Sequence, residues 1–323
     1  DSDRQKQMYR LYALDKTNAA AAFSQIENGM LLDLAHDAMK NGSVMRAVYE
    51  QPALARQDGL WMLNNKRWGR IGGINGHGYN LTIGKDFLFD EHGYYGLLFD
   101  YGSNTVSGAA GSGEYDSYSL GLYAGNKNKP GSITGFVSYG LQANKGTAYL
   151  PVLGQTAESG YDSKTLGIGV EYAYDLDYGK PEELWHVSPY ARLNFTHYRQ
   201  KAFREHGAGV FDRSFGSYSD NYAEGELGLS FDRSEGTGGY GIRLGYKRIL
   251  AGERQLMEVC FAEDECGALL PVRSWGEGRN HFVAAAYVRH DFSRKWSAGG
   301  SLSGDWSNGG REIGARLDLA YHF

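Results

Sequence analysis

From about residue 60 to the C-terminus, apolar side chains recur at every second position. The last segment shows this most clearly, with apolar residues at 313, 315, 317, 319, 321 and 323. Successive side chains of a β-strand point to opposite faces, so these six share one face. The segments 166–174, 227–231 and 240–246 repeat the pattern. The alternation predicts strands with one apolar face and one face of small or charged residues.

The number and spacing of these segments predict an antiparallel meander of about twelve strands. The predicted strands lie near 60–71, 78–88, 94–106, 115–125, 132–148, 161–175, 185–203, 220–233, 240–258, 277–291, 296–307 and 311–323. Connections after even-numbered strands are short and rich in turn residues. Several after odd-numbered strands are longer, notably 149–160, 204–219 and 259–275. Short turns at one rim and longer loops at the other are typical of an outer-membrane barrel.

The direction of the apolar face separates a membrane barrel from a soluble one. A soluble barrel points its apolar face inward, but twelve strands would enclose more space than those side chains could fill. With the apolar face toward lipid, the small and charged residues line a wet lumen. Aromatic residues lie near many predicted strand ends, as interfacial girdles require: Tyr94, Tyr95, Tyr101, Tyr161, Tyr174, Tyr240, Trp296 and Trp306.

Several charged residues fall on the inward face by the same parity. They are Glu171, Arg192, Glu224, Glu226, Arg243, Arg316 and Asp318. They can form a solvated pore wall of mutual ion pairs. Alternatively, some of them hold an N-terminal helix through Lys40, Glu27 or Asp33. We therefore predict that these residues line the pore and anchor the helix.

The N-terminal segment has a helical pattern instead. Residues 18–40 are rich in Ala, with Thr17 or Asn18 as a candidate N-cap and Asn41-Gly42 as a stop. About 23 residues at roughly 1.5 Å each give a helix near 34 Å long, comparable to a membrane's thickness. Its apolar side chains cover one side only, which excludes a membrane span. It could cover a soluble core or lie inside a polar lumen.

The flanking residues complete the predicted N-terminal region. Residues 1–17 are polar and are expected to be ordered only by context, and a short helix is predicted over 43–51, before Pro52. We predict a linker over 1–58 that carries the pore helix, followed by the barrel over 59–323. The chain starts without a signal peptide, so we expect an export signal further upstream.

Composition and charge narrow the function without deciding the fold. The mean hydropathy is −0.49, and no apolar stretch reaches the roughly 18–20 residues of a membrane helix. Membrane-spanning barrel strands do not give a continuous apolar stretch, because lipid-facing and lumen-facing residues alternate. With 46 Gly and 24 Tyr, the composition fits a soluble β protein and an outer-membrane barrel equally. The net charge of −5 argues against a nucleic-acid partner.

Cysteines and histidines offer little site chemistry. Cys260 and Cys266 lie in one predicted loop and either close a small disulfide or remain two thiols; a disulfide would imply an oxidising compartment. The nine histidines lack ligand spacing, and no HExxH, G-x-S-x-G or P-loop motif occurs. We therefore expect no metal and no cofactor.

Taken together, the order of elements over about residues 18–323 resembles the autotransporter β-domain family: a linker helix, about twelve strands and a terminal aromatic residue. The most specific local feature is the final strand ending Tyr321-His322-Phe323. Segments 93–106 and 118–125 also look like the family's early strands. The fold is therefore expected to be all-β, a transmembrane antiparallel barrel with an N-terminal α-helix inside the pore.

The resemblance implies type V secretion. The barrel would insert into the outer membrane as a monomer and export an N-terminal passenger to the cell surface. The expected partners are outer-membrane lipid, the passenger, periplasmic chaperones and the barrel-assembly machinery, which would read Tyr321 and Phe323. The alternatives are an outer-membrane porin or channel and a barrel-embedded hydrolase, which would need a Ser/His/Asp cluster at one rim.

Some members of the family cleave their own passenger by cyclisation of an Asn in the helix, assisted by acidic barrel residues. The candidates here are Asn18, Asn28 and Asn41, with Glu171, Glu224 and Glu226 as the acids. The family's double-Asn motif is missing from the helix, and the similar Asn64-Asn65 lies in the first predicted strand. Self-cleavage is therefore a minor alternative to a translocator without catalysis.

Overall fold

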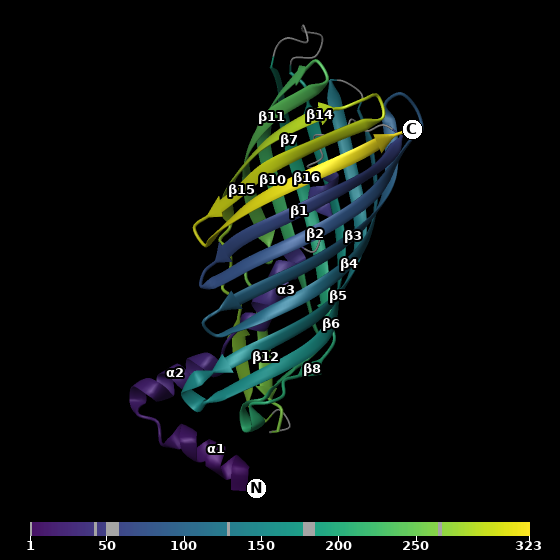
Figure 1. Ribbon diagram of the computed structural model, residues 1–323. Helices are drawn as coiled ribbons and strands as arrows, with labels where there is room; N and C mark the ends of the chain where they lie inside the picture. The colour runs from purple at the N-terminus through teal and green to yellow at the C-terminus, as the bar shows by residue number, and fades with distance from the viewer. Residues whose placement is uncertain (1, 42–43, 50–57, 128–129, 177–184, 264–266) are drawn as a thin grey trace.

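The computed structural model describes residues 2–41, 44–49, 58–127, 130–176, 185–263 and 267–323. Within these ranges, twelve strands form one closed antiparallel barrel (Figure 1). They are β1 (Gly59–Ile71), β2 (Ile74–Leu88), β3 (Gly93–Gly108), β4 (Gly111–Asn126), β5 (Gly131–Leu150), β6 (Gln155–Tyr174), β7 (His186–Gln200), β10 (Tyr218–Glu235), β11 (Gly238–Ala251), β14 (Asn280–Asp291), β15 (Trp296–Ser307) and β16 (Gly310–His322). The predicted strand count and fold class are confirmed.

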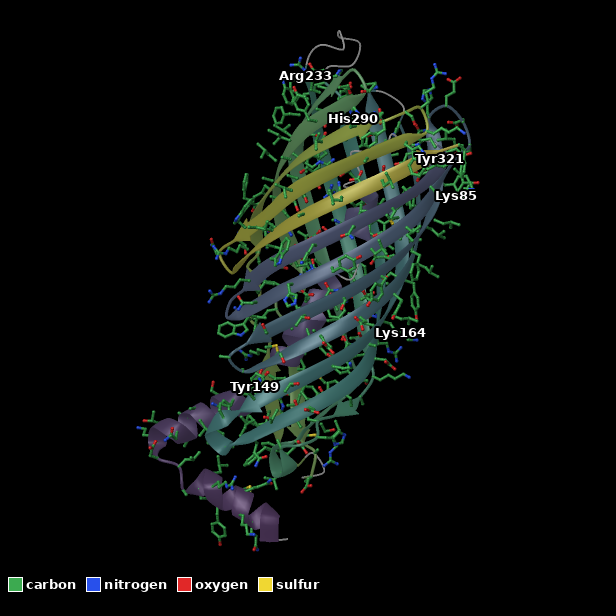
Figure 2. All side chains as sticks on the ribbon, viewed as in Figure 1. Lys85, Tyr149, Lys164, Arg233, His290 and Tyr321 are labelled. Atoms are coloured by element: carbon green, nitrogen blue, oxygen red, sulfur yellow. The ribbon has the colours of Figure 1, made fainter. Side chains whose placement is uncertain are left out.

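The barrel closes where its first and last strands pair. The register runs from Gly59 opposite His322 to Ile71 opposite Gly310. Along β16 the exposed Leu317 and Leu319 alternate with the buried Arg316 and Asp318. The same alternation covers the barrel, and Figure 2 shows side chains projecting outward along its length. The apolar face therefore points away from the lumen, as the parity predicted.

The two ends of the barrel differ. At one end, which we call the terminal end, β1 begins and β16 ends (upper end in Figure 1). At the other end, the lid end, a second sheet orders its strands β13-β12-β9-β8. These strands are β8 (Phe203–Arg204), β9 (Arg213–Phe215), β12 (Leu256–Phe261) and β13 (Leu269–Arg273). The predicted long loops 204–219 and 259–275 thus contain strands of a lid.

The prediction of a third long loop over 149–160 is wrong. β5 and β6 continue to the turn η1 (Pro151–Leu153) and pair throughout. Their tip buries Ala148 and Ala157 in a cluster with Phe211, from the turn η2 (Gly209–Phe211). Outward positions near the tip are polar, so hydropathy ended both predicted strands too early. Inward packing against the lid keeps the pairing regular.

The N-terminal region forms four helices among the described residues: α1 (Ser2–Tyr12), α2 (Lys16–Ile26), α3 (Met30–Asn41) and α4 (Met45–Tyr49). The helix predicted over 18–40 is therefore broken between α2 and α3. α3 lies inside the barrel and α4 packs against its inner wall, while α1 and α2 lie outside at the lid end (Figure 1). None of the described helices has the length and apolar character to cross a membrane.

Of two smaller N-terminal predictions, the N-cap at Thr17 or Asn18 is wrong. Residues 1–17 were expected to be ordered only by context, and α1 covers most of them. Its Gln7 side chain accepts a hydrogen bond from Val210 N, so the lid supplies the context. The N-cap of α2 is Asp15, whose Oδ1 accepts from Asn18 N at 2.8 Å. Cys266, one half of the predicted disulfide with Cys260, lies outside the described residues.

The break between α2 and α3 has a local cause. Asn28 Oδ1 accepts from Met30 N at 2.7 Å and its amide donates to Ala110 O at 2.6 Å, which fixes the start of α3 against the barrel rim. A Cβ on Gly29 would overlap the backbone carbonyl of Arg273. Gly29 therefore lets the chain pass directly under the lid.

Replacing Gly29 with alanine should loosen α3 by about 1–3 kcal/mol, the usual range for overpacking. Amide hydrogen exchange over α3 should become faster in Gly29→Ala. Gly216→Ala is the matched control, because an added Cβ at Gly216 meets nothing within 4 Å. Equal α3 exchange in both variants would mean that the close approach to Arg273 does not seat the helix.

Candidate functional site: a helix held inside the barrel

Helix α3 fills the lid half of the lumen. All twelve of its residues are buried, the charged ones included. Apolar side chains fit against glycines of the inner barrel wall: a Cβ on Gly146 would overlap Leu31, and one on Gly113 would approach Leu34 to 3.1 Å. Glycine on the inward face of β4 and β5 thus makes room for the helix.

Asp37 makes the first polar anchor. It faces Arg67 of β1, and the guanidinium holds both carboxylate oxygens, with Nη1 donating to Oδ1 at 3.0 Å. Tyr115 donates to Oδ2 at 2.9 Å, and Asn41 donates to Oδ1 at 3.0 Å. Arg67 is 2 % exposed and also donates to Asn104 at 2.8 Å. We call this group of residues the Asp37 clamp.

Glu277 makes the second anchor, from the segment between β13 and β14. Its carboxylate accepts hydrogen bonds from Lys40 Nζ at 2.5 Å and from Tyr222 Oη at 2.9 Å. His36 Nε2 lies 3.2 Å from the same carboxylate. Burial alone would raise the pKa of Glu277, but Lys40 and His36 hold it well below its usual range. Glu277 therefore stays ionised at neutral pH and pairs with a helix cation. We call this group the Glu277 clamp.

A third contact fixes the break before α3. Arg213 of β9 donates from Nη1 to the carbonyls of Ile26 and Asn28, at 3.0 and 2.7 Å. Glu205 neutralises the same guanidinium through contacts of 2.8 and 2.6 Å. The last carbonyls of a helix lack partners within the helix, and a cation there also complements the helix dipole. The lid is thus tied directly to the end of α2.

The charged residues predicted from parity all come from barrel strands and line the lumen. Arg192 lies 2.6 Å from Glu171 and 3.5 Å from Glu226, and Arg243 lies 3.4 Å from Glu171. The Arg192 guanidinium also lies 4.8 Å from the ring centroid of Tyr49 in α4. The structure therefore joins this group to α4 rather than to α3.

The other predicted residues lie elsewhere in the lumen. Glu224 accepts from Asn194 at 3.2 Å and from Tyr222 at 3.1 Å, and Tyr222 in turn reaches Glu277. Arg316 and Asp318 lie 3.7 Å apart on β16. Glu224 therefore contacts the Glu277 clamp through the Tyr222 hydroxyl.

The helix charges meet partners other than those expected. Lys40 pairs with Glu277, and Asp33 accepts from the backbone of Trp275 at 2.8 Å. Glu27 is exposed at the helix break. Arg67 and Glu277, the main partners of α3, were missed. Inward parity on β1 could have identified Arg67. Glu277 was placed at the start of the predicted strand 277–291, but in the structure it precedes β14 and lies outside any strand.

The three candidate cleavage asparagines contact other groups. Asn18 bonds to Asp15 outside the barrel, Asn28 to Ala110 and Met30, and Asn41 to Asp37. Within the described residues, none of their hydrogen bonds goes to Glu171, Glu224 or Glu226, the proposed acids. No group of three metal-ligating side chains that could hold an ion occurs in that part of the chain either.

Comparison with solved structures finds autotransporter barrels. The translocator domain of NalP from Neisseria meningitidis matches with a TM-score of 0.75 and 16% identity, covering 91% of this chain and 98% of that one. The beta domain of Bordetella BrkA matches with a TM-score of 0.63 and 14% identity, covering 83% and 100%. The transport unit of AIDA-I from Escherichia coli matches at 0.59 and 11%, covering 92% and 99%. At these identities the likeness supports the fold alone.

The family assignment rests on a match to the sequence. The family profile described as Autotransporter beta-domain matches residues 60–303, most of the chain. The comparison with curated proteins gives no match. Family membership implies an outer-membrane setting and a passenger linked at the N-terminal side. This chain therefore belongs to the autotransporter beta-domain family, the outer-membrane translocator barrels of type V secretion.

Proposed function

We propose that this barrel exports its own passenger and is afterwards closed by α3, held by the Asp37 and Glu277 clamps. The observation that carries the proposal is the complete burial of α3 in the lumen together with its ion pairs to β1 and to the segment before β14. A porin needs an open lumen, and a helix held by buried charges opposes that.

The proposal includes a sidedness and a division of the chain. The terminal end, with the short turns 89–92, 236–237 and 292–295, faces the periplasm, and the lid end faces the cell surface. Residues 1–58 serve as the linker and 59–323 as the barrel. Because α1 and α2 lie at the lid end, a passenger linked to the N-terminal side of α1 would lie outside the cell.

An epitope placed ahead of Asp1, behind an upstream export signal, should be cleaved by protease added to intact cells. A second epitope in the turn 292–295 should survive in intact cells and be cleaved only after permeabilisation. An N-terminal epitope that is protected in intact cells would contradict export and favour a porin or hydrolase reading.

The final strand is proposed to be the assembly signal. Phe323 is 64% exposed, and the Tyr321 ring contacts Trp296 and Phe323 at centroid distances of 4.9 and 5.6 Å. Figure 2 shows Tyr321 at the rim of the terminal end, close to Lys85. An exposed terminal aromatic contributes little to the core, so its role is recognition by the barrel-assembly machinery.

Deleting Phe323 should lower the amount of folded, heat-modifiable barrel in outer membranes several-fold, while purified and refolded protein keeps near-normal stability. Phe292→Ala is the control, because Phe292 is an equally exposed aromatic at the same end, 66% exposed. Unchanged assembly without Phe323 would remove its proposed role.

The remaining partners follow from the surface. Outward Leu, Ile, Val and aromatic side chains form a belt around the strands, which suits lipid. Before insertion this belt would be exposed to water, so periplasmic chaperones are expected to bind the unfolded chain. Each chain carries its own closed barrel and its own helix, and a monomer suffices for export.

A further inference from the structure

The outward surface over β14, β15, β16 and β1 is hollowed. Three small residues of its lining lie on adjacent strands: Ala286 of β14, Gly300 of β15 and Ala315 of β16. With Leu302 and Leu317 they line a depression of about 660 Å³. This volume is within the roughly 300–1,000 Å³ of typical small-ligand sites. Its lining is mainly apolar and lies within the belt of exposed apolar side chains.

A cluster of cations borders the hollow on the lid side. Arg70 of β1 and Arg311 of β16 are register partners, so their side chains emerge on the same outward face. Lys66 lies on that face four residues before Arg70, and its Nζ is 5.2 Å from the ring centroid of Trp68. Arg70 Nε donates to Gly72 O at 3.2 Å. Like charges directly opposite on a sheet destabilise it.

The cations lack an acidic counterpart on this face. Over the described ranges, no ion pair joins Lys66, Arg70 or Arg311 to a carboxylate. Glu312, next to Arg311 in sequence, points inward and lies 3.5 Å from Arg67 instead. Lys66 also lies within the apolar belt, where a cation is unfavourable unless its side chain reaches toward the interface. Its position over Trp68 shows that it extends toward the aromatic residues.

We propose that this surface binds a phosphorylated glycolipid of the outer leaflet, with phosphate on Arg70, Arg311 and Lys66 and an acyl chain in the hollow. Arginine forks match phosphate oxygens in pairs, and an anion between two facing arginines removes their repulsion. The aromatic Trp68 and Trp306 lie on the same outward face as the cations, where headgroup and acyl chain would meet. The choice of the outer leaflet rests on the proposed function, which places the lid end at the cell surface; the binding surface itself does not depend on it.

The test uses the purified full chain in detergent, with native mass spectrometry after titration with bisphosphorylated lipid A, phosphatidylglycerol or phosphatidylethanolamine. Lipid A should bind most tightly to the unchanged protein. Arg70→Gln/Arg311→Gln should weaken it by roughly tenfold or more, since charge-assisted contacts to phosphate are lost. Ala286→Phe should fill the hollow and weaken lipid A as well.

The matched control is Lys164→Gln/Arg199→Gln. Lys164 and Arg199 are also basic register partners on the outward face, but they lie on β6 and β7, away from the hollow (Lys164 in Figure 2). This variant should bind lipid A like the unchanged protein. Equal loss in both double variants, or equal affinity for all three lipids, would overturn the proposal. So would a homodimer that Ala286→Phe abolishes, because a second copy would then occupy the hollow. Passenger export is measured separately, so either proposal can fail alone.

Discussion

Asp37→Ala should convert a nearly closed barrel into one that conducts ions. The substitution leaves Arg67 buried without its main carboxylate partner, and breaking a buried pair from one side costs about 3–5 kcal/mol. The strands keep their own hydrogen bonds, so the barrel itself stays folded. The lost free energy instead destabilises the state in which α3 is bound inside the lumen. About 3 kcal/mol would raise the population of unseated helix roughly a hundredfold. Single-channel recording in planar bilayers measures this as more frequent and longer openings.

Two variants make this result specific. Glu27→Ala removes an exposed carboxylate from the same N-terminal region and should conduct like the unchanged protein. Asp37→Ala/Arg67→Ala removes both charges and should close more often than Asp37→Ala, because no buried cation is left unpaired. If Asp37→Ala stayed as quiet as Glu27→Ala, the Asp37 clamp would not hold the helix.

The barrel could be predicted from the sequence because its information is local. Period-two alternation sets the inward and outward faces of each strand, as in Leu317 and Asp318, without any knowledge of the neighbouring strands. The short turns set the strand order. Strand ends were less certain where outward residues become polar, as at the tip between β5 and β6. There, burial of Ala148 and Ala157 against the lid keeps the strands paired, and this contact is distant in sequence.

The site was predictable only in outline. A mixed polar helix of the right length could be placed in the lumen, but its break could not, because Gly29 is required by the Arg273 carbonyl of the lid. Likewise, Glu277 is the first residue of the predicted strand 277–291 but precedes β14 in the structure, and only the folded chain brings it to Lys40. The predicted inward charges such as Arg192 and Glu171 are in the lumen, yet local parity cannot tell which of them face α3 and which face α4.

The second large effect concerns the whole N-terminal region. Without α3, the lumen between the Asp37 clamp and the lid would hold water instead of a helix. Eight-stranded barrels are filled by their own side chains and much wider barrels leave an aqueous channel, so twelve strands without filling should conduct. Deleting residues 1–45 removes the first three helices and leaves every barrel strand, with only residues 46–49 of α4 still in the lumen. Conductance should therefore rise far above that of Asp37→Ala.

Planar-bilayer conductance of the full chain and of the chain without residues 1–45 therefore tests the central claim, that α3 closes the barrel. Circular dichroism and heat-modifiability must first show that both form the same folded barrel. We predict a small conductance with rare openings for the full chain, and a steady, several-fold larger conductance for the shortened one. Equal conductance of the two folded barrels would contradict the claim.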